Sequence, residues 1–523
     1  MSAYRRLAGT MAVMDRRRWS EDYVAHVLRP NFAQAKRYLF RPLMLVNKAH
    51  AVTLWRAGLL DNHDVALVLQ GLRDIEARGA ASYSYSEDVE DLYFAVERDL
   101  IAAAGVDAGG NLQIARSRND VDQAMLRMVL RETLLGTLET LNDLRQVIAR
   151  RAVQHATSLM PGYTHTQPAQ PTTLGHYLGA ILSALARDAT RLRAAYLDAN
   201  HSPLGAAALT TSGFPIQRQV PEQLLGFRGL VENSIDAVGA SDHVLQSLGA
   251  VLVLEGNLSR FNFDLLQYAS REVGFLRVPD SFVQISSIMP QKRNPVVLEH
   301  SRARFARAHG QAQEVFTLAR NVPYGDTNDV GENLIEPTFS AFTELGEGIA
   351  LLSAVLEDAT FNVARMQALA GDGFTTATGL ADWLVQHRRL PFRTAHGIAS
   401  RVVDLAVAAG LEAAQVTPEM VDVAALERVG HPVELTPENL HAALDPRGFV
   451  EARALPGGPA SRVLLPFLAR AQDTVTTDEA WRRAESRRLR MAREALDTIV
   501  DDLIPPSRAS GVLTANEVTA VKT

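Results

Sequence analysis

The chain of 523 residues contains no cysteine. Disulfides, thiolate nucleophiles, iron–sulfur clusters and zinc sites with cysteine ligands are therefore excluded for it. Long hydrophobic runs are also missing: no uninterrupted apolar stretch approaches the roughly 18 residues of a membrane helix. The arginines at 16–18 could suggest a twin-arginine signal, but the Trp-Ser-Glu-Asp that follows them is no hydrophobic region. We expect a cytoplasmic protein without a membrane segment, whose true start is Met1, Met11 or Met14.

An excess of positive charge is absent too. The sequence has 53 Lys and Arg against 59 Asp and Glu, which gives a net charge of −6. Neither a nucleic acid nor a membrane surface is therefore expected as a partner. Metal-ligand spacings such as His-Glu-x-x-His and glycine-rich nucleotide loops are missing as well. The sequence predicts acid–base and electrostatic chemistry without a metal or cofactor.

Long helical patterns dominate what is present. Residues 121–157 contain one glycine and no proline, and their apolar residues recur at spacings of three and four. Strand-like alternation is scarce, and the run Val251–Leu254 is apolar on more than one side of a helix. This pattern predicts an all-α protein with helices buried in a bundle or an oligomer core. Similar helical stretches cover 172–200, 234–270, 296–320 and 337–370.

Polar loops separate these helices, and an all-helical enzyme would place its chemistry there. A change of composition near 371–378 indicates a domain boundary, followed by shorter elements. Residues 474–501 have the pattern of a charged, solvated amphipathic helix, and we expect the tail after Pro505 to be disordered. The loops span 104–110, 161–171, 201–215, 278–295 and 321–336.

Three segments carry most of the polar chemistry. Arg116-Ser117-Arg118-Asn119-Asp120 precedes a long helix, where backbone N–H groups and guanidinium groups can bind a carboxylate or phosphate. The plainer interpretation is a helix cap with Asn119 or Asp120 at the N-cap and solvated arginines.

The second segment, residues 162–171, contains Thr164 as a donor and His165 as a group that can transfer protons near neutral pH. A single histidine is more often a packed or surface residue. The third segment, residues 286–295, places hydroxyl, ammonium, guanidinium and amide groups within ten residues, and Glu299 follows. It suits a mobile loop that closes over an anion, or else a polar surface loop.

Together, in this order and spacing, the three segments resemble the argininosuccinate lyase family of the fumarase/aspartase superfamily. Ser286–Pro295 (Ser-Ser-Ile-Met-Pro-Gln-Lys-Arg-Asn-Pro) is similar to the superfamily's signature loop, and 115–120 and 162–171 are similar to the family's versions of the other two signature regions. The resemblance continues through Pro203-Leu204-Gly205 and Pro391-Phe392-Arg393 and covers roughly residues 30 to 470.

The resemblance implies three helical domains, at 1–120, 121–372 and 373–523. It further implies that a central five-helix bundle from each of four subunits forms a twenty-helix core, with active sites where three subunits meet. The implied reaction is an anti elimination: a base removes the proton beside a carboxylate, an aci-carboxylate forms, and the C–N bond breaks to release fumarate and an amine.

By motif position, Ser286 matches the catalytic base and Ser287 its neighbour. His165 matches the residue that protonates the leaving nitrogen, and Glu299 matches the carboxylate that orients it. The implied dicarboxylate-binding residues are Ser117, Arg118, Asn119, Thr164, Lys292 and Asn294. No cofactor or metal is implied.

The sequence departs from the family pattern mainly where that family binds arginine. A site that lacks hydrogen-bond partners for a charged amino-acid group should lose affinity for it. The replacements are Phe32 and Lys36 for Ser and Asp, Leu92-Tyr93 for Ile-His, Gln113-Ile114 for His-Thr, Ile285 for Gly, and Pro323, Asn328 and Gly331 for Tyr, Gln and Lys.

We therefore predict a fumarate-forming C–N lyase whose amine is a diamine, an amino acid or another small amine, as in relatives that split ethylenediamine-disuccinate. The reaction could also run as amine addition to fumarate. A genuine argininosuccinate lyase of arginine biosynthesis is the first alternative. A cycloisomerase of the superfamily and a non-catalytic structural relative, like the lens proteins of this family, are the others.

Overall fold

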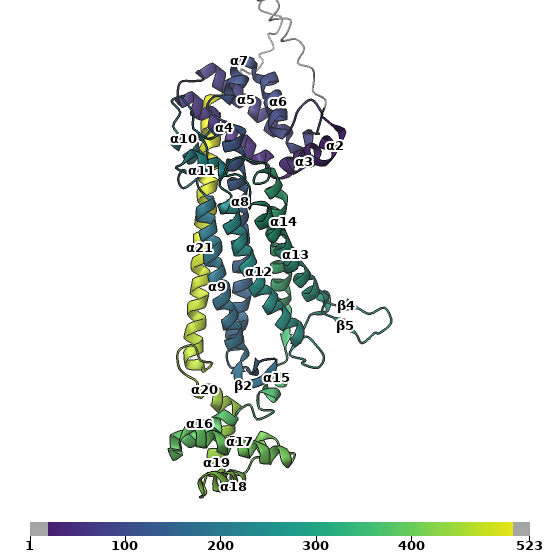
Figure 1. Cartoon of the computed structure of the whole chain (residues 1–523), viewed down its shortest axis with the longest axis vertical. Helices are drawn as coiled ribbons and strands as arrows, with labels where there is room; N and C mark the ends of the chain where they lie inside the picture. Colours follow the sequence, from purple (N-terminus) through teal and green to yellow (C-terminus); the bar gives the residue numbers. More distant parts are fainter. Residues whose placement is uncertain (1–18, 506–523) are drawn as a thin grey trace, which may run out of the picture.

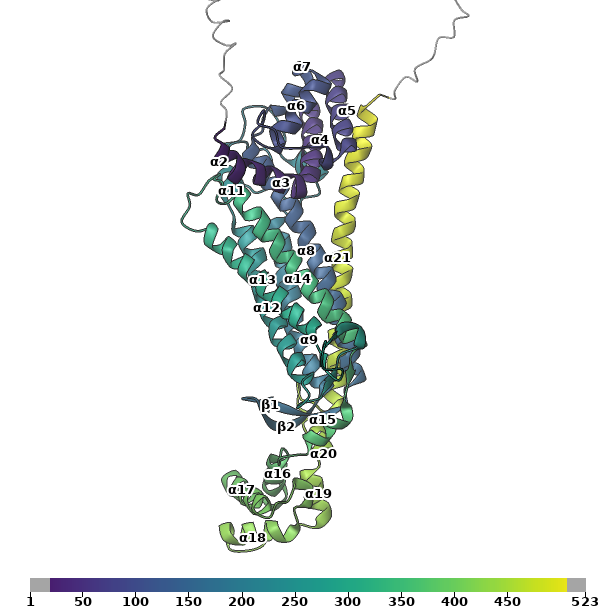
Figure 2. The same cartoon turned by 90° about the vertical axis from the view of Figure 1, so that its right-hand side faces the viewer.

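The computed structural model describes residues 19–505, which form an elongated bundle of long helices with a smaller helical domain at each end (Figures 1 and 2). The predicted all-α class is confirmed. Strands occur within the described part only as three short antiparallel pairs, β1–β2, β3–β6 and β4–β5. The arginines at 16–18, the alternative starts and the tail after Pro505 lie outside the described residues.

The N-terminal domain covers one end of the bundle (Figure 1). Aspartates begin two of its helices: Asp61 accepts hydrogen bonds from the backbone N–H groups of His63 and Asp64, and Asp91 accepts one from Phe94. Helix α4 is buried along nearly its whole length. The elements are α2 (Glu21–Tyr23), η1 (Val24–Leu28), α3 (Arg29–Tyr38), α4 (Phe40–Arg56), α5 (Asn62–Arg78), η2 (Ala80–Ser82), α6 (Leu92–Ala104), α7 (Val106–Gly109) and η3 (Gly110–Gln113).

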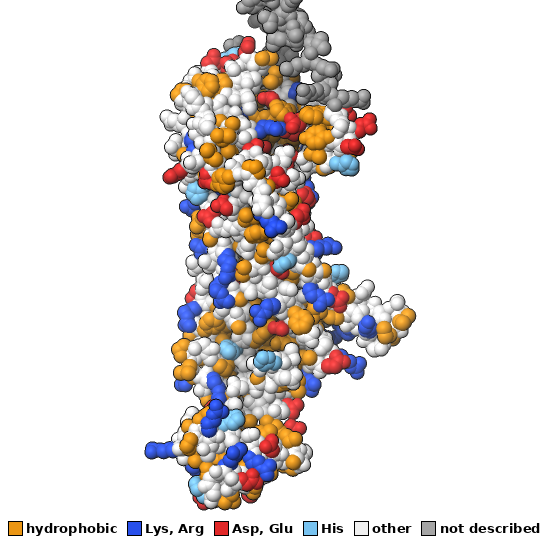
Figure 3. Space-filling model, in the orientation of Figure 1, with side chains coloured by type: hydrophobic (Ala, Val, Ile, Leu, Met, Phe, Trp, Pro, Cys, Tyr) orange, Lys and Arg blue, Asp and Glu red, His pale blue; other side chains and the backbone are white. Residues whose placement is uncertain are grey.

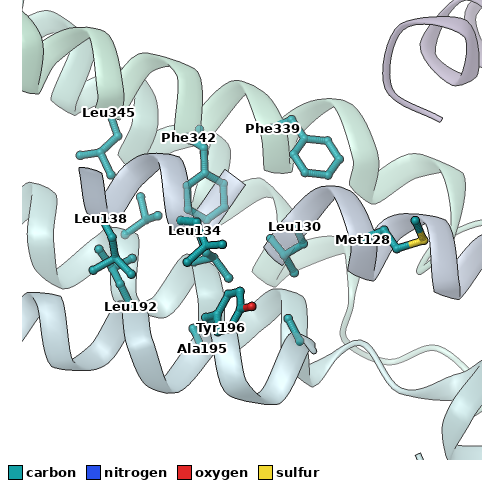
Figure 4. Close-up of a cluster of buried hydrophobic side chains, with 14 of the residues drawn as sticks. Met128, Leu130, Leu134, Leu138, Leu192, Ala195, Tyr196, Phe339, Phe342 and Leu345 are labelled. Carbon is teal, nitrogen blue, oxygen red and sulfur yellow. The ribbon is translucent and has the colours of Figure 1, made fainter. Parts of the chain in front are cut away.

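The central bundle confirms the predicted long helices to within a few residues in most cases. Apolar side chains from α8, α9 and α14 meet along its axis (Figure 4). Burial of each such leucine or phenylalanine contributes about 1.5 to 3 kcal/mol. The bundle helices are α8 (Arg118–Gln154), α9 (Leu174–Ala199), α12 (Asp242–Tyr268), α13 (Val296–Leu318), α14 (Glu332–Asp358) and α21 (Ser461–Leu503). The side chains labelled in Figure 4 include Leu130, Leu134 and Leu138 of α8, Leu192 and Tyr196 of α9, and Phe339, Phe342 and Leu345 of α14.

Short elements connect the bundle helices. The strands are β1 (Leu159–Thr164), β2 (Gln167–Thr173), β3 (Leu276–Arg277), β4 (Gln284–Ile285), β5 (Arg293–Asn294) and β6 (Thr360–Phe361). The short helices are α10 (Gln219–Leu224), α11 (Ser234–Gly239) and η4 (Asp280–Phe282).

The far end of the bundle carries a second small helical domain with its own hydrophobic core, built around Leu384, Ile398 and Val421. This core begins at Leu380, just beyond the boundary that the sequence predicts near 371–378. The elements from this end onward are α15 (Val363–Ala370), α16 (Ala377–Arg388), α17 (Phe392–Ala408), η5 (Ala413–Gln415), α18 (Pro418–Val429), α19 (Pro437–Leu444) and α20 (Pro446–Ala452).

Helix α21 is not the solvated helix of a domain at 373–523 that the sequence predicts. It returns along α8 and α9 as far as α4 and α5 (yellow in Figure 2), so the last helix belongs to the bundle. Its buried charges are paired: Arg145 Nη1 of α8 lies 2.8 Å from Asp478, and Tyr196 of α9 donates a 3.0 Å hydrogen bond to Glu485. The charged pattern suggested solvent because sequence periodicity does not show which charges pair.

One described helix, α14, is long and apolar enough to cross a membrane by length and composition. Half of its apolar window is buried inside the protein. It packs against α13, α8 and α12, so these apolar residues form part of the bundle core.

Candidate active site

The first candidate segment forms the start of α8. Ser117 is the N-cap, not Asn119 or Asp120: its backbone is extended, and its Oγ accepts a 3.4 Å hydrogen bond from the N–H of Asn119. The N–H of Ser117 in turn donates to Asp120 Oδ1 at 3.0 Å, which completes a capping box. The helix N-terminus thus presents Ser117, Arg118 and Asn119 together, where its dipole favours an anion.

Asp120 joins this helix start to the loop that follows α9. Its buried Oδ2 accepts hydrogen bonds from the N–H groups of Gly205 at 2.8 Å and Ala207 at 2.9 Å. Burial raises the pKa of Asp120 to about 6, although the three backbone N–H donors oppose that rise. Asn119 Nδ2 also donates to the carbonyl of Ala208 at 3.0 Å. The loop and the helix start are therefore held as one unit.

Arg118 is already paired within the chain. Its Nη1 donates to Asp91 at 2.5 Å and lies 3.9 Å from Glu90, and its guanidinium stacks over the ring of Phe94. Asp91 is also the N-cap of α6. The orientation of Arg118 is thus fixed by the N-terminal domain.

The second candidate segment is a β-hairpin, where a loop was expected. His165 and Thr166 form its two-residue turn between β1 and β2, with φ of 51° and 63°. A two-residue turn of this hand requires positive φ, which costs a residue with a Cβ roughly 1 to 2 kcal/mol. The usual Asn-Gly signal is missing, so the sequence did not reveal the hairpin. Thr164 and His165 are both exposed at its tip.

The third candidate segment connects β4 and β5 in a loop that projects from the side of the bundle (Figure 1). Ser286 Oγ accepts hydrogen bonds from the N–H groups of Met289 at 3.1 Å and Ile288 at 3.4 Å. Such donors stabilise negative charge on the serine oxygen. Ile285 and Ile288 are 76% and 81% exposed, and Figure 3 shows hydrophobic side chains at the tip of this projection. Ser287 and Lys292 are exposed as well, and Asn294 lies in β5.

Within one chain the three segments do not meet. Helix α8 has 37 residues, which at 1.5 Å per residue separates Ser117 at its start from the hairpin beyond its end by about 55 Å. Glu299 is exposed on the first turn of α13. No hydrogen bond or ion pair joins it to His165 within residues 19–505. The chain therefore groups Ser117, Arg118 and Asn119, and separates them from Thr164 with His165 and from the Ser286 loop.

A pocket of about 80 Å³ adjoins the α8 start. It lies among α3, α8, α14 and the segments 91–93 and 326–332. Four carboxylates line it, those of Asp91, Asp122, Asp326 and Glu332, together with Arg118. Sequence reasoning missed this site. Asp122 shares a helix face with the apolar Met125 and Leu126. A carboxylate on an otherwise apolar helix face is the sequence feature that could have indicated the pocket.

Some of the positions that depart from the family pattern line this pocket, and others do not. Asn328 and Gly331 line it, but Pro323 does not. Phe32 is 2% exposed and packs in the core, and Lys36 Nζ donates to the carbonyl of Tyr83 at 2.6 Å. Neither side chain is among those that line the pocket.

Comparison with known protein families matches two family models. The model described as "Lyase" matches residues 35–310, and the model described as "Argininosuccinate lyase C-terminal" matches residues 374–451. The argininosuccinate lyase of Methanoculleus marisnigri is 38% identical over 452 residues, which is 86% of this chain and 90% of that protein. Argininosuccinate lyase 1 of Shouchella clausii is 34% identical over 459 residues, covering 88% and 92%.

Comparison with solved structures agrees with these family matches. The crystal structure of EDDS lyase in complex with formate has a TM-score of 0.84 and 31% identity, and covers 91% of this chain and 96% of that one. An EDDS lyase variant with bound fumarate has a TM-score of 0.84 and 30% identity, covering 94% and 99%. The 3-carboxy-cis,cis-muconate lactonizing enzyme of Pseudomonas putida, at 20% identity and a TM-score of 0.67 over 88% of this chain and 100% of that one, shares the fold.

Proposed function

The chain belongs to the argininosuccinate lyase family of the fumarase/aspartase superfamily, and from this premise we propose that it cleaves an N-substituted aspartate whose amine is not arginine. The family makes the chain a carbon–nitrogen lyase that forms fumarate. Its substrate is accordingly a dicarboxylate. The amine, the composite site and the cytoplasmic location are our proposals.

One observation carries the proposal about the amine. In the pocket beside the α8 start, the only cationic side chain among the described lining residues is Arg118, and it is paired with Asp91. Because Arg118 is proposed to bind the succinyl part of the substrate, the carboxylate of an arginine product would find no further cation there and would face Asp122 and Glu332 instead. Like charges in a partly buried pocket disfavour binding. Gly331, which stands where the family pattern has lysine, adds no charge.

The catalytic roles that we propose follow the matched motifs. Ser286, with its oxygen held by two N–H groups, removes the proton beside the carboxylate, and Ser287 supports it. Each donor aimed at the aci-carboxylate lowers the barrier by roughly 3 kcal/mol. His165, oriented by Glu299, then gives a proton to the leaving nitrogen as the C–N bond breaks. The proposed donors are Ser117, Arg118, Asn119, Thr164, Lys292 and Asn294.

We further propose that several copies of the chain build each site, in a homotetramer. The separation of the three segments along the bundle supports this, because a dicarboxylate is far smaller than about 55 Å. Exposed apolar side chains on the bundle also favour burial against further copies: Val253 and Phe263 of α12 are 42% and 51% exposed.

Argininosuccinate lyase itself is the second candidate function. The names of the two argininosuccinate lyases compared above favour it. A cycloisomerase is not favoured, since the likeness to the lactonizing enzyme extends to the fold alone.

The experiment that separates the two candidates follows fumarate by its ultraviolet absorbance. Purified protein is given argininosuccinate, and in parallel fumarate with a panel of amines that includes arginine. We expect slow or no release from argininosuccinate and consumption of fumarate with another amine. Release from argininosuccinate at a rate typical of the family would overturn the proposal and assign the protein to arginine biosynthesis.

A further inference from the structure

The pocket beside the α8 start has an excess of unpaired acceptors. Arg118 pairs with Asp91, and Glu332 accepts a hydrogen bond from Asn31. Asp122 and Asp326 form no hydrogen bond or ion pair with any residue that the structure describes. The formal charge of the lining is therefore negative: four carboxylates face one guanidinium.

Two buried oxygens without partners point to a missing donor. Gln123 is 4% exposed and lines the pocket, and its Oε1 has no hydrogen-bond partner in the described chain. Thr327 lines the pocket next to Asp326 in the segment 326–332, and its buried Oγ1 is likewise without a hydrogen-bond partner in the described chain. Buried acceptors normally find a donor, and leaving one unpaired costs about 1 to 3 kcal/mol. A ligand rich in N–H groups would satisfy both.

The protonation of the carboxylates agrees with this arrangement. Burial, and then the charge of Asp91, raise the pKa of Asp122 well above its usual range, although Arg118 opposes the rise. Burial followed by the charge of Asp91 also raises the pKa of Glu332, and burial raises that of Asp326. A bound cation would relieve the repulsion among these groups.

The chemistry of the lining favours an ammonium over a metal ion. No group of three or more His, Asp and Glu among residues 19–505 has an arrangement that could hold a metal. The carboxylates stand beside a wall of aliphatic side chains, which suits the methylene groups of an alkylammonium. This wall consists of Leu39, Leu43, Leu126 and Ile335.

We propose that this pocket binds a second, non-reacting ammonium group of the amine, so that the substrate amine is an alkyl diamine or polyamine without a carboxylate. The inference rests on the proposed function, because it assumes that the α8 start holds the succinyl part of the substrate. Arg118 is common to the α8 start and to the pocket, which places the ammonium next to the dicarboxylate. The reacting nitrogen would then lie between the two.

Calorimetric binding to the intact protein tests the pocket without requiring turnover. The ligands are α,ω-diamines of two to five carbons, the monoamines of the same lengths, and ornithine as a diamine with a carboxylate. We expect one diamine to bind at least tenfold more tightly than its monoamine and than ornithine. Asp122→Asn should remove most of that preference, and Asp107→Asn, an exposed residue of α7, should leave it unchanged.

Fumarate consumption with the same amines separates failure of the inference from failure of the proposed function. Consumption at equal KM for diamines and monoamines, unaltered by Asp122→Asn, would overturn the diamine inference and leave the lyase proposal standing. Preferential diamine binding without consumption of fumarate would retain the pocket and refute its role in the reaction. Absence of both preferential binding and consumption would refute both.

Discussion

Tyr93 donates a hydrogen bond of 2.5 Å to the side-chain oxygen of Gln113, and both residues stand where the family pattern has histidine. Arg116 joins the pair, since its Nε donates to the same oxygen at 3.2 Å and its guanidinium lies over the Tyr93 ring. The two departures are thus one local arrangement, and they position the arginine that precedes the Ser117 cap.

The hydrogen bond between Tyr93 and Gln113 predicts that substitutions at these two positions have coupled effects on stability. Tyr93→Phe and Gln113→Leu should each lower the free energy of unfolding by about 1 kcal/mol, because each removes the same hydrogen bond. The double variant should cost less than the sum, with a coupling near 1 kcal/mol. Urea unfolding of the unaltered protein, the two single variants and the double variant measures this coupling free energy. Strict additivity would mean that the contact contributes nothing.

Ser286→Ala is expected to reduce fumarate formation by at least about a thousandfold, since it removes the proposed base. The protein should stay folded, because Ser286 accepts hydrogen bonds only from neighbouring N–H groups of its own exposed loop. Ser84→Ala, at an exposed position of the N-terminal domain, is the matched control. Unchanged turnover in Ser286→Ala would remove this residue from the mechanism.

A site shared between chains predicts complementation between two inactive variants. His165→Asn removes the imidazole at a turn position with positive φ, which asparagine tolerates, and Ser286→Ala alters the separate loop. Co-expressed from two genes, they should form mixed oligomers in which about a quarter of the sites are intact, if each site takes the two residues from different chains. Activity should be measured on oligomers purified through a tag on each variant. Complete inactivity of the mixed oligomers would place both residues of each site on one chain.

The helices could be predicted because their 3.6-residue periodicity is local, as in the stretch 121–157. The hairpin at His165 could not, since its turn lacks glycine or asparagine and is stabilised by its surroundings. Helix α21 looked solvated because its charges carry no sign of pairing, whereas Asp478 and Glu485 are buried against the bundle. The acidic pocket was missed for a related reason: Asp122 and Asp326 lie some 200 residues apart in sequence, and only the fold brings them to one cavity.

The motif-derived site residues are only partly arranged by the single chain. Ser117, Arg118 and Asn119 are contiguous on one helix start, so sequence proximity was enough to group them. The link between His165 and Glu299 came from the family resemblance, and it stays a prediction because no hydrogen bond or ion pair joins the two residues within the described chain.

The buried charges of α21 predict a specific pH dependence of stability. Glu479 is held by Arg482, with Nε at 2.8 Å and Nη2 at 2.7 Å, and by Asn142 at 3.2 Å. The pKa of Glu479 is lowered from 4.5 to about 2, and the hydrogen bonds from Arg482 are the largest cause of this shift. Because the folded-state pKa is depressed, this stabilisation is complete above pH 4.5 and is lost as the pH falls toward 2.

Glu479→Gln should therefore lower the free energy of unfolding by about 2 to 3 kcal/mol at pH 7, and the difference from the unaltered protein should shrink as the pH falls below 4.5. Denaturant unfolding at pH 7, 5, 4 and 3.5 measures it. Glu494→Gln on the same helix is the control: its pair with Arg490 is 3.7 Å long and both side chains are more than 60% exposed, so the cost should stay below about 0.5 kcal/mol at every pH. A Glu479→Gln difference that is independent of pH would show that packing or hydrogen-bond geometry, and not the charge of the carboxylate, accounts for the loss.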